Sequence, residues 1–174
     1  MTPPTRDASL DASFADGGRE GPLRLRAVDA EDLRIVSALV QDAVFSAADM
    51  ALIRRGRRFA VLLNRFRWER GATRPERVRA MLVVQDVTAA ATAGFRPGDG
   101  DTVLSLLALD FTPGADGTGR LTLTLSGDGA VHLDVECLEV GLWDVTRPYA
   151  APSGRAPEHP EAPPEVPDGT AGQP

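Results

Sequence analysis

Arginine is concentrated in one stretch of the chain. All 19 basic residues are arginines, and ten of them lie between Arg54 and Arg79, where Glu69 and Glu76 are the only acids. Guanidinium groups make bidentate contacts with phosphate and carboxylate, and a neighbouring aromatic residue such as Trp68 can stack on a nucleic-acid base. This stretch is therefore the first candidate for binding an anion, a partner protein or a nucleic acid.

The strongest strand pattern of the chain coincides with this stretch. Alternation over 58–70 places Asn64 and Trp68 on one face, and Arg65 and Arg67 on the other. The first half of the segment is apolar on both faces and predicts a central strand, whereas the second half predicts a half-exposed strand with an aromatic and a cationic face. These four residues are the first part of the candidate site.

The remaining candidates, His132 and Glu136, lie on a later predicted strand. With Asp134 they share one face at a spacing of two, so their tips could converge on a metal ion. The same alternation is typical of a solvent-facing hairpin strand, and we predict no metal site. Cys137 is expected to point inward with Val131 and to be buried and unreactive.

Another interpretation of the arginines is purely structural. Asp134, Glu136 and Glu139 lie on a strand that could neighbour the arginine-rich one, and cross-strand pairs of opposite charge are common. The arginines would then be matched by the chain's own acids. An internal Arg–Glu pair that fixes strand register belongs to the same interpretation.

Composition narrows the functional classes. A net charge of −6 and a pI of about 4.9 argue against general attraction to nucleic acid or to an anionic membrane. The sequence has neither a membrane-spanning apolar run nor a secretory signal, so we expect a cytoplasmic protein. The glycine-rich stretches lack the spacing of phosphate-binding loops, and the sequence nominates no catalytic residue and no cofactor.

The remaining segments predict an α+β fold. Asp29 is a predicted N-cap for a helix over 30–44, and 120–125 with 131–140 is a predicted hairpin across 126–129. Gly56 is expected to provide the backbone freedom for a tight turn over 54–57. We predict one N-terminal helix packed on a mainly antiparallel, curved sheet of about six to seven strands.

Composition also predicts three regions along the chain. Residues 1–21 have few large apolar side chains and are expected to be a disordered N-terminal extension. Residues 22–150 form the predicted single α+β domain. Residues 151–174 contain seven prolines and are expected to be a mostly disordered tail.

Several short motifs resemble one protein family. They are the segments 64–69 (NRFRWE), 104–109 (LSLLAL), 135–139 (VECLE) and 157–160 (PEHP). Together they are similar to a family of uncharacterised alphaproteobacterial proteins that is classed only as a domain of unknown function, over about 23–159. The resemblance implies a small, single-domain, cytoplasmic bacterial protein and implies no activity, cofactor or catalytic residue.

These observations lead to three functional interpretations. The first is a non-catalytic binding module whose arginine- and tryptophan-bearing sheet face contacts a protein partner, a second copy of the chain or an anionic small molecule. The alternative is an enzyme or enzyme accessory for a phosphorylated or carboxylated metabolite, in which Arg65 and Arg67 hold the anion and Glu136 or His132 carries a proton. Nucleic-acid binding comes third.

Overall fold

The computed structural model describes residues 21–70 and 75–157 of the 174-residue chain. In this part the chain forms one α-helix, α1 (Ala30–Val40), and eleven strands that belong to one antiparallel sheet. The strands are β1 (Arg24–Ala27), β2 (Ala43–Ser46), β3 (Met50–Ile53), β4 (Arg58–Phe66), β5 (Glu76–Val84), β6 (Val87–Ala93), β7 (Val103–Pro113), β8 (Gly119–Leu125), β9 (Ala130–Val135), β10 (Val140–Asp144) and β11 (Tyr149–Ala150).

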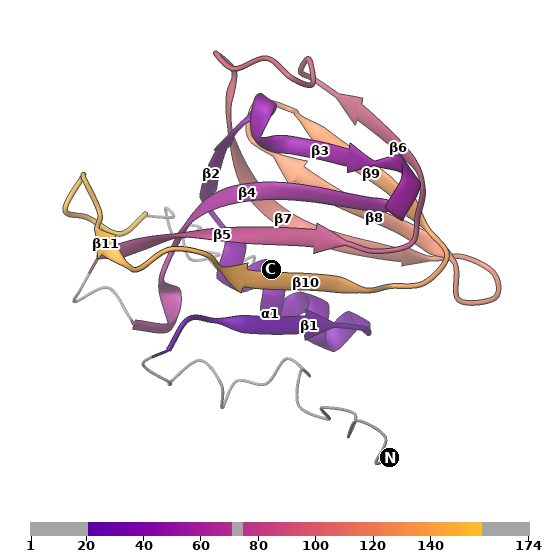
Figure 1. Ribbon diagram of the computed structural model, residues 1–174, viewed down its shortest axis with the longest axis horizontal. Helices are drawn as coiled ribbons and strands as arrows, with labels where there is room; N and C mark the ends of the chain where they lie inside the picture. Colours follow the sequence, from indigo (N-terminus) through magenta and orange to yellow (C-terminus); the bar gives the residue numbers. More distant parts are fainter. Residues whose placement is uncertain (1–20, 71–74, 158–174) are drawn as a thin grey trace, which may run out of the picture.

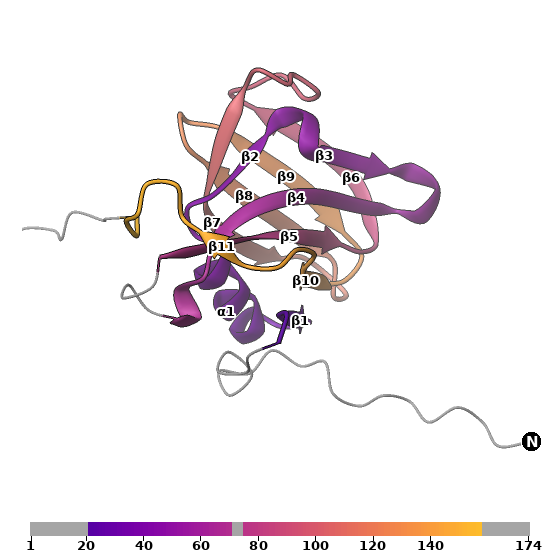
Figure 2. The same cartoon turned by 60° about the vertical axis from the view of Figure 1, so that its left-hand side comes forward.

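The sheet is strongly curved and not closed. Its strand order is β1-β10-β5-β4-β2-β7-β8-β9-β6, while β11 pairs with β5 and β3 pairs with β4. Figures 1 and 2 show the strands wrapping around a common interior, with α1 beside β1 at one end. The α+β class, the single helix and the antiparallel curved sheet are confirmed, but the strand number predicted from the sequence is too low.

The number of strands predicted from the sequence was too low because short and interrupted strands have weak sequence patterns. The predicted strand over 131–140 ends at Val135 as β9, because the chain bends at Glu136 and Cys137, and a separate strand, β10, begins only at Val140. The segment after β5 becomes a strand of its own, because Asp86 adopts a left-handed conformation with φ 53°. The four-residue β2 and the two-residue β11 carry too few residues for a periodic signal.

The helix begins as predicted and ends four residues early. The side chain of Asp29 accepts a hydrogen bond of 2.8 Å from the backbone N–H of Asp32, as expected for an N-cap. The helix ends at Val40, because Asp42 adopts φ 59° and donates its N–H to the carbonyl of Leu106 on β7. The chain is thereby drawn into the sheet as β2.

The turn before β4 also differs in detail from the prediction. Residues 54–56 form a single 3-10 turn, η3 (Arg54–Gly56). The left-handed residue is Arg57, with φ 48°, and not Gly56. Arg57 is held there by bonds of its backbone and side chain to the neighbouring elements, which offset the cost of this conformation for a residue with a Cβ.

One apolar core fills the concave side of the sheet. Its members come from α1 and from nearly every strand, and they include Val36, Leu63, Leu82, Leu123 and Leu142. The inward side of β4 is the face that carries Val61, Leu63 and Arg65. The arginine face predicted to be half exposed therefore continues the core.

Two expectations lie largely outside the described residues. These are the disordered extension over 1–21 and the tail over 151–174, of which only residue 21 and residues 151–157 are described. In the described part no helix is long and apolar enough to cross a membrane.

Candidate functional site

The end of β4 carries a buried cluster of charged side chains. Arg65 is completely buried and lies between two carboxylates. Its Nε and Nη2 donate to Oδ1 and Oδ2 of Asp144 at 2.9 Å each, and its Nη1 and Nη2 donate to Glu69 at 3.0 and 2.9 Å. Asp144 also accepts a bond from the N–H of Leu23, so the cluster joins β4, β10 and the segment before β1.

Arg65 has no donor left for a ligand. A guanidinium has five N–H donors. Four of those of Arg65 are used by Asp144 and Glu69, and the fifth faces the carbonyl oxygen of Phe66 at 3.4 Å. The donors of Arg65 are therefore used within the chain, and the pair that joins distant strands is Arg65–Asp144 rather than an Arg–Glu pair, because Glu69 lies only four residues away.

The pairing fixes the charge state of the cluster. Burial by itself raises the pKa of Glu69, but the hydrogen bonds and positive charge of Arg65 outweigh it, so the pKa of Glu69 lies below its ordinary value. Burial likewise opposes the charged form of Arg65, and its bonds to Glu69 and Asp144 raise its pKa above the ordinary value. Both side chains are thus ionised at neutral pH.

Arg67 is different, because part of its guanidinium makes no hydrogen bond to a described residue. Only 5% of its side chain is exposed, and its Nη1 donates to Oε2 of Glu76 at 2.7 Å. Its Nε is buried without a hydrogen-bond partner, since the nearest oxygen of Glu69 is 3.6 Å away. Nη2 makes no hydrogen bond to a described residue either. The edge formed by Nε and Nη2 is the one that binds carboxylate or phosphate side-on.

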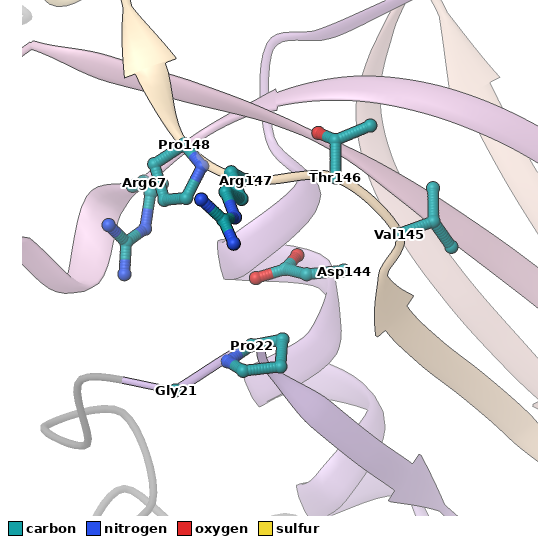
Figure 3. A pocket seen from close by; sticks show the side chains of 8 residues that line it. All are labelled: Gly21, Pro22, Arg67, Asp144, Val145, Thr146, Arg147 and Pro148. Carbon is teal, nitrogen blue, oxygen red and sulfur yellow. The ribbon is translucent and has the colours of Figure 1, made fainter.

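Arg67 lines a hollow of about 420 Å³, here named the Arg67 hollow. Figure 3 shows the guanidinium groups of Arg67 and Arg147 and the carboxylate of Asp144 turned towards it. Arg147 is exposed and makes no hydrogen bond or ion pair with the described part of the chain. The lining residues are Gly21, Pro22, Arg67, Asp144, Val145, Thr146, Arg147 and Pro148.

The charges around this hollow balance. Arg65, Arg67 and Arg147 are opposed by the three carboxylates of Glu69, Glu76 and Asp144. The hollow therefore has no strong net positive field, and its affinity for an anion would come from directed N–H donors. Pro22, Val145 and Pro148 provide apolar walls beside these donors.

Trp68 and Asn64 are held by the chain itself. The indole Nε1 of Trp68 donates to the carbonyl of Gln41 at 3.0 Å, and its ring packs edge-on against Phe66 with centroids 4.6 Å apart. The side chain of Asn64 accepts a bond of 2.7 Å from the hydroxyl of Tyr149. Asn64 borders a different hollow, of about 200 Å³, and not that of Arg67. The predicted aromatic face is thus part of the packing.

Glu136 and His132 lie far from these residues. Glu136 binds Arg57 with both carboxylate oxygens, at 2.7 and 2.8 Å. Arg57 precedes β4 and Arg67 follows it, so the two arginines are separated by the length of a nine-residue strand, about 25 Å. His132 lies on β9, which is four places from β4 in the strand order. The structure therefore does not bring the six candidate residues together, and the proton carriers of the enzyme interpretation are remote from Arg65 and Arg67.

His132 occupies the middle of β9. Its Nδ1 lies 3.2 Å from the hydroxyl of Thr122 on β8. Asp134, its neighbour on the same face, pairs with Arg120, while Glu136 lies beyond the end of the strand. Among the described residues no group of three or more His, Cys, Asp or Glu side chains could hold a metal ion.

The three acids expected to pair with arginines all do so. Asp134 pairs with Arg120, Glu136 with Arg57 and Glu139 with Arg26. Only Arg57 belongs to the arginine-rich stretch.

Cys137 does not point inward. It is exposed, and its Sγ lies 3.4 Å from the carboxylate of Asp86. The prediction failed because it extended the alternation of β9 through a bend: the strand ends at Val135. Burial, the bond to Asp86 and the acids around it raise the pKa of the thiol.

Two charged residues of the Arg67 hollow, Asp144 and Arg147, were not among the candidates predicted from the sequence. Asp144 had a detectable signal, because it follows Val140 and Leu142 at a spacing of two and so occupies an inward position of β10. Arg147 had none, since it lies in a short connection without periodicity.

Comparisons with known proteins give one match. No curated protein and no solved structure matches the chain. The match is to a protein-family model that covers residues 23–159, from the start of the sheet through the whole described core. The matched range contains the cluster around Arg65 and Arg67 and leaves out only the two ends of the chain. The chain therefore belongs to the family described as "Protein of unknown function (DUF2948)".

Proposed function

We propose that the protein is a non-catalytic binding module that takes a small carboxylate-bearing molecule in the Arg67 hollow. The observation that carries this proposal is the buried Nε of Arg67 beside that hollow, which has no hydrogen-bond partner and only a long ion pair of 3.6 Å with Glu69. A buried donor without an acceptor is costly, and a ligand carboxylate would remove that cost. Arg147 supplies a second cation next to Arg67 on the lining of the same hollow (Figure 3).

The walls of the hollow favour a carboxylate that carries an apolar group. Pro22, Val145 and Pro148 offer no hydrogen-bond donors from their side chains, and they would exclude water from the ligand's apolar part. Nucleic acid fits poorly, because Arg65 and Arg67 are buried and the net charge is −6. Catalysis is not supported, because His132 and Glu136 are remote from the hollow.

A ligand titration with matched variants tests this proposal. The melting temperature is measured with increasing benzoate and, separately, inorganic phosphate, at constant ionic strength. Benzoate should raise it, because a ligand that binds only the folded state stabilises that state. Arg147→Gln removes an exposed cation without breaking a bond within the described chain, and it should abolish most of the rise.

Arg34→Gln is the matched control. Arg34 is an exposed arginine on α1, outside the residues that line the hollow. The variant should retain the full benzoate effect. An equal effect of benzoate on Arg147→Gln and the unchanged protein, or no effect on either, would contradict the proposal.

A further inference from the structure

Strand β6 is an unprotected edge of the sheet. Within residues 21–70 and 75–157, it ends the strand order and pairs on one side only, with β9. All seven of its residues are uncharged, none is proline, and every residue after Val87 is exposed. An edge strand presents N–H and C=O groups without partners, and proteins usually protect such edges with charges, prolines or short length.

The other edges of the sheet have such protection. β1, at the opposite end of the strand order, carries Arg24 and Arg26 within four residues. β11 has only two residues, and β3 has four. Among the edge strands, β6 is therefore the only described one that is both long and uncharged. This difference indicates that β6 pairs with a further strand.

A gap separates β6 from β3. The two strands are not paired with each other in the described part of the chain. The start of β6 is joined to the residue after η3, because the N–H of Val87 donates to the carbonyl of Arg57 at 2.8 Å. Figures 1 and 2 both show β3 and β6 on the same side of the molecule, converging near η3. Between them lies a hollow of about 520 Å³, here named the β3–β6 gap, lined by Leu52, Arg54, Arg57, Val87, Thr88, Ala89 and Ala90.

We propose that the β3–β6 gap is a site for strand addition by an extended, acidic peptide segment of a partner protein. The peptide backbone pairs with the free edge of β6, at the usual spacing of about 4.8 Å between strands. The alanines of β6 leave room for the peptide's side chains, and Leu52 gives an apolar contact from the β3 side. The added strand extends the sheet across its open side.

The charge of the gap selects an acidic segment. Arg54 lines the gap, is exposed and has no partner among the described residues. Arg55 in η3 and Arg58 at the start of β4 do not line the gap, but their side chains are also exposed and unpaired in the described part. Arg57 is already matched, because it binds both Asp86 and Glu136. The four arginines of 54–58 outnumber these two carboxylates, so the η3 end of the gap has a positive surplus that would attract acidic side chains.

This site is independent of the Arg67 hollow. The two hollows share no lining residue and lie at opposite ends of β4. The strand-addition site would remain if the hollow bound no carboxylate, and the reverse also holds.

The test combines a binding measurement with amide hydrogen exchange on the full chain. The probe is a short fluorescein-labelled peptide of alternating valine and threonine with an aspartate at each end, compared with the same peptide carrying lysine at each end. The aspartate peptide should bind more tightly. It should also slow exchange of those β6 amides that are not bonded to β9, because backbone pairing protects them.

Variants separate the charge from the backbone contribution. Arg54→Glu should weaken binding of the aspartate peptide by about fivefold, the effect of an exposed charge pair. Arg34→Glu, the same change on an exposed position of α1, should leave binding unchanged. Neither arginine side chain makes a bond to a described residue, so both variants should fold, which circular dichroism checks.

Several results would overturn the proposal. Equal binding of both peptides would contradict the proposal that the partner segment is acidic. Binding without protection of the β6 amides would contradict the proposal that the peptide pairs with β6 as an added strand. Protection of these amides in dilute protein without peptide would mean that the chain's own terminal segments occupy the edge. Protection that grows with protein concentration, together with a larger particle in sedimentation, would identify a second copy as the occupant instead.

Discussion

Arg65 and Asp144, 79 positions apart in the chain, form a buried two-point ion pair with both bonds at 2.9 Å. The pair spans β5, which lies between β4 and β10 in the sheet. Arg65 is opposite Val78 and Asp144 is opposite Ala80, so the two side chains meet over small residues of the middle strand. The pair thereby fixes the relative register of three strands beside the candidate site.

Asp144→Asn should destabilise the fold strongly. The change keeps the size of the side chain but leaves the buried Arg65 with one carboxylate in place of two. We expect a loss of about 3 kcal/mol in the free energy of unfolding, because a buried charge loses its partner. Urea denaturation measures this loss.

Asp134→Asn is the comparison for that experiment. Asp134 pairs with Arg120 in a similar two-point geometry, but both side chains are exposed. Removing an exposed pair should cost less than about 1 kcal/mol. Similar losses in the free energy of unfolding for both variants would mean that burial does not determine how much the Arg65–Asp144 pair stabilises the fold.

The main elements of the fold were predictable because their patterns are regular. The helix start at Asp29 and the β8–β9 hairpin follow from a cap residue and from alternation, and both are confirmed. The helix end and the break between β5 and β6 were not predictable. Each depends on an aspartate in a left-handed conformation, Asp42 or Asp86, which a single sequence does not distinguish from other aspartates.

The candidate site was only partly predictable for a related reason. Alternation correctly grouped Arg65 with Val61 and Leu63, but an arginine on a strand face was taken to be half exposed. Its burial depends on Asp144, which lies on a distant strand. Two inward charged positions of opposite sign, each at the end of an apolar alternation, are the signal that could have indicated a buried pair.

Stability should fall in acid through Glu69. The pKa of Glu69 is lower in the folded protein than its ordinary value of 4.5, so the unfolded chain binds a proton first. The stabilisation is therefore complete above about pH 4.5 and is lost as the pH falls through the lower, folded pKa. The free energy of unfolding of the unchanged protein should decrease over this range, and that of Glu69→Gln should decrease less.

Salt distinguishes Glu69 from the exposed acids. The pKa of Glu136 is also lowered, by its bonds to Arg57, but this pair lies on the surface. High salt should suppress the effect of Glu136→Gln on the pH profile and leave that of Glu69→Gln, because exposed pairs are screened more strongly. Loss of both effects in salt would contradict the buried position of Glu69.

Cys137 should react slowly despite its exposure. Burial of its sulfur, the bond to Asp86 and the nearby acids raise the pKa of the thiol above its ordinary value of 9.0. The thiolate is the reactive form, so the midpoint of the pH–rate profile with iodoacetamide should lie above 9.0. Asp86→Asn should lower that midpoint. Asp128→Asn, at an exposed turn, should not change it.

Gly119→Ala should destabilise the β7–β8 hairpin. A Cβ on Gly119 would lie 2.7 Å from the carbonyl oxygen of Thr112 and closer still to the ring of Phe111. Phe111 is only partly buried, but the carbonyl of Thr112 belongs to the backbone of β7 and cannot move away without disturbing the pairing of β7 with β8. We expect a loss of about 1–3 kcal/mol in the free energy of unfolding.

Gly100→Ala is the control, because its Cβ would meet nothing within 4 Å, and that variant should keep its stability in the same urea titration. If both variants were equally stable, the close approach of β8 to Phe111 would not be a constraint on the fold.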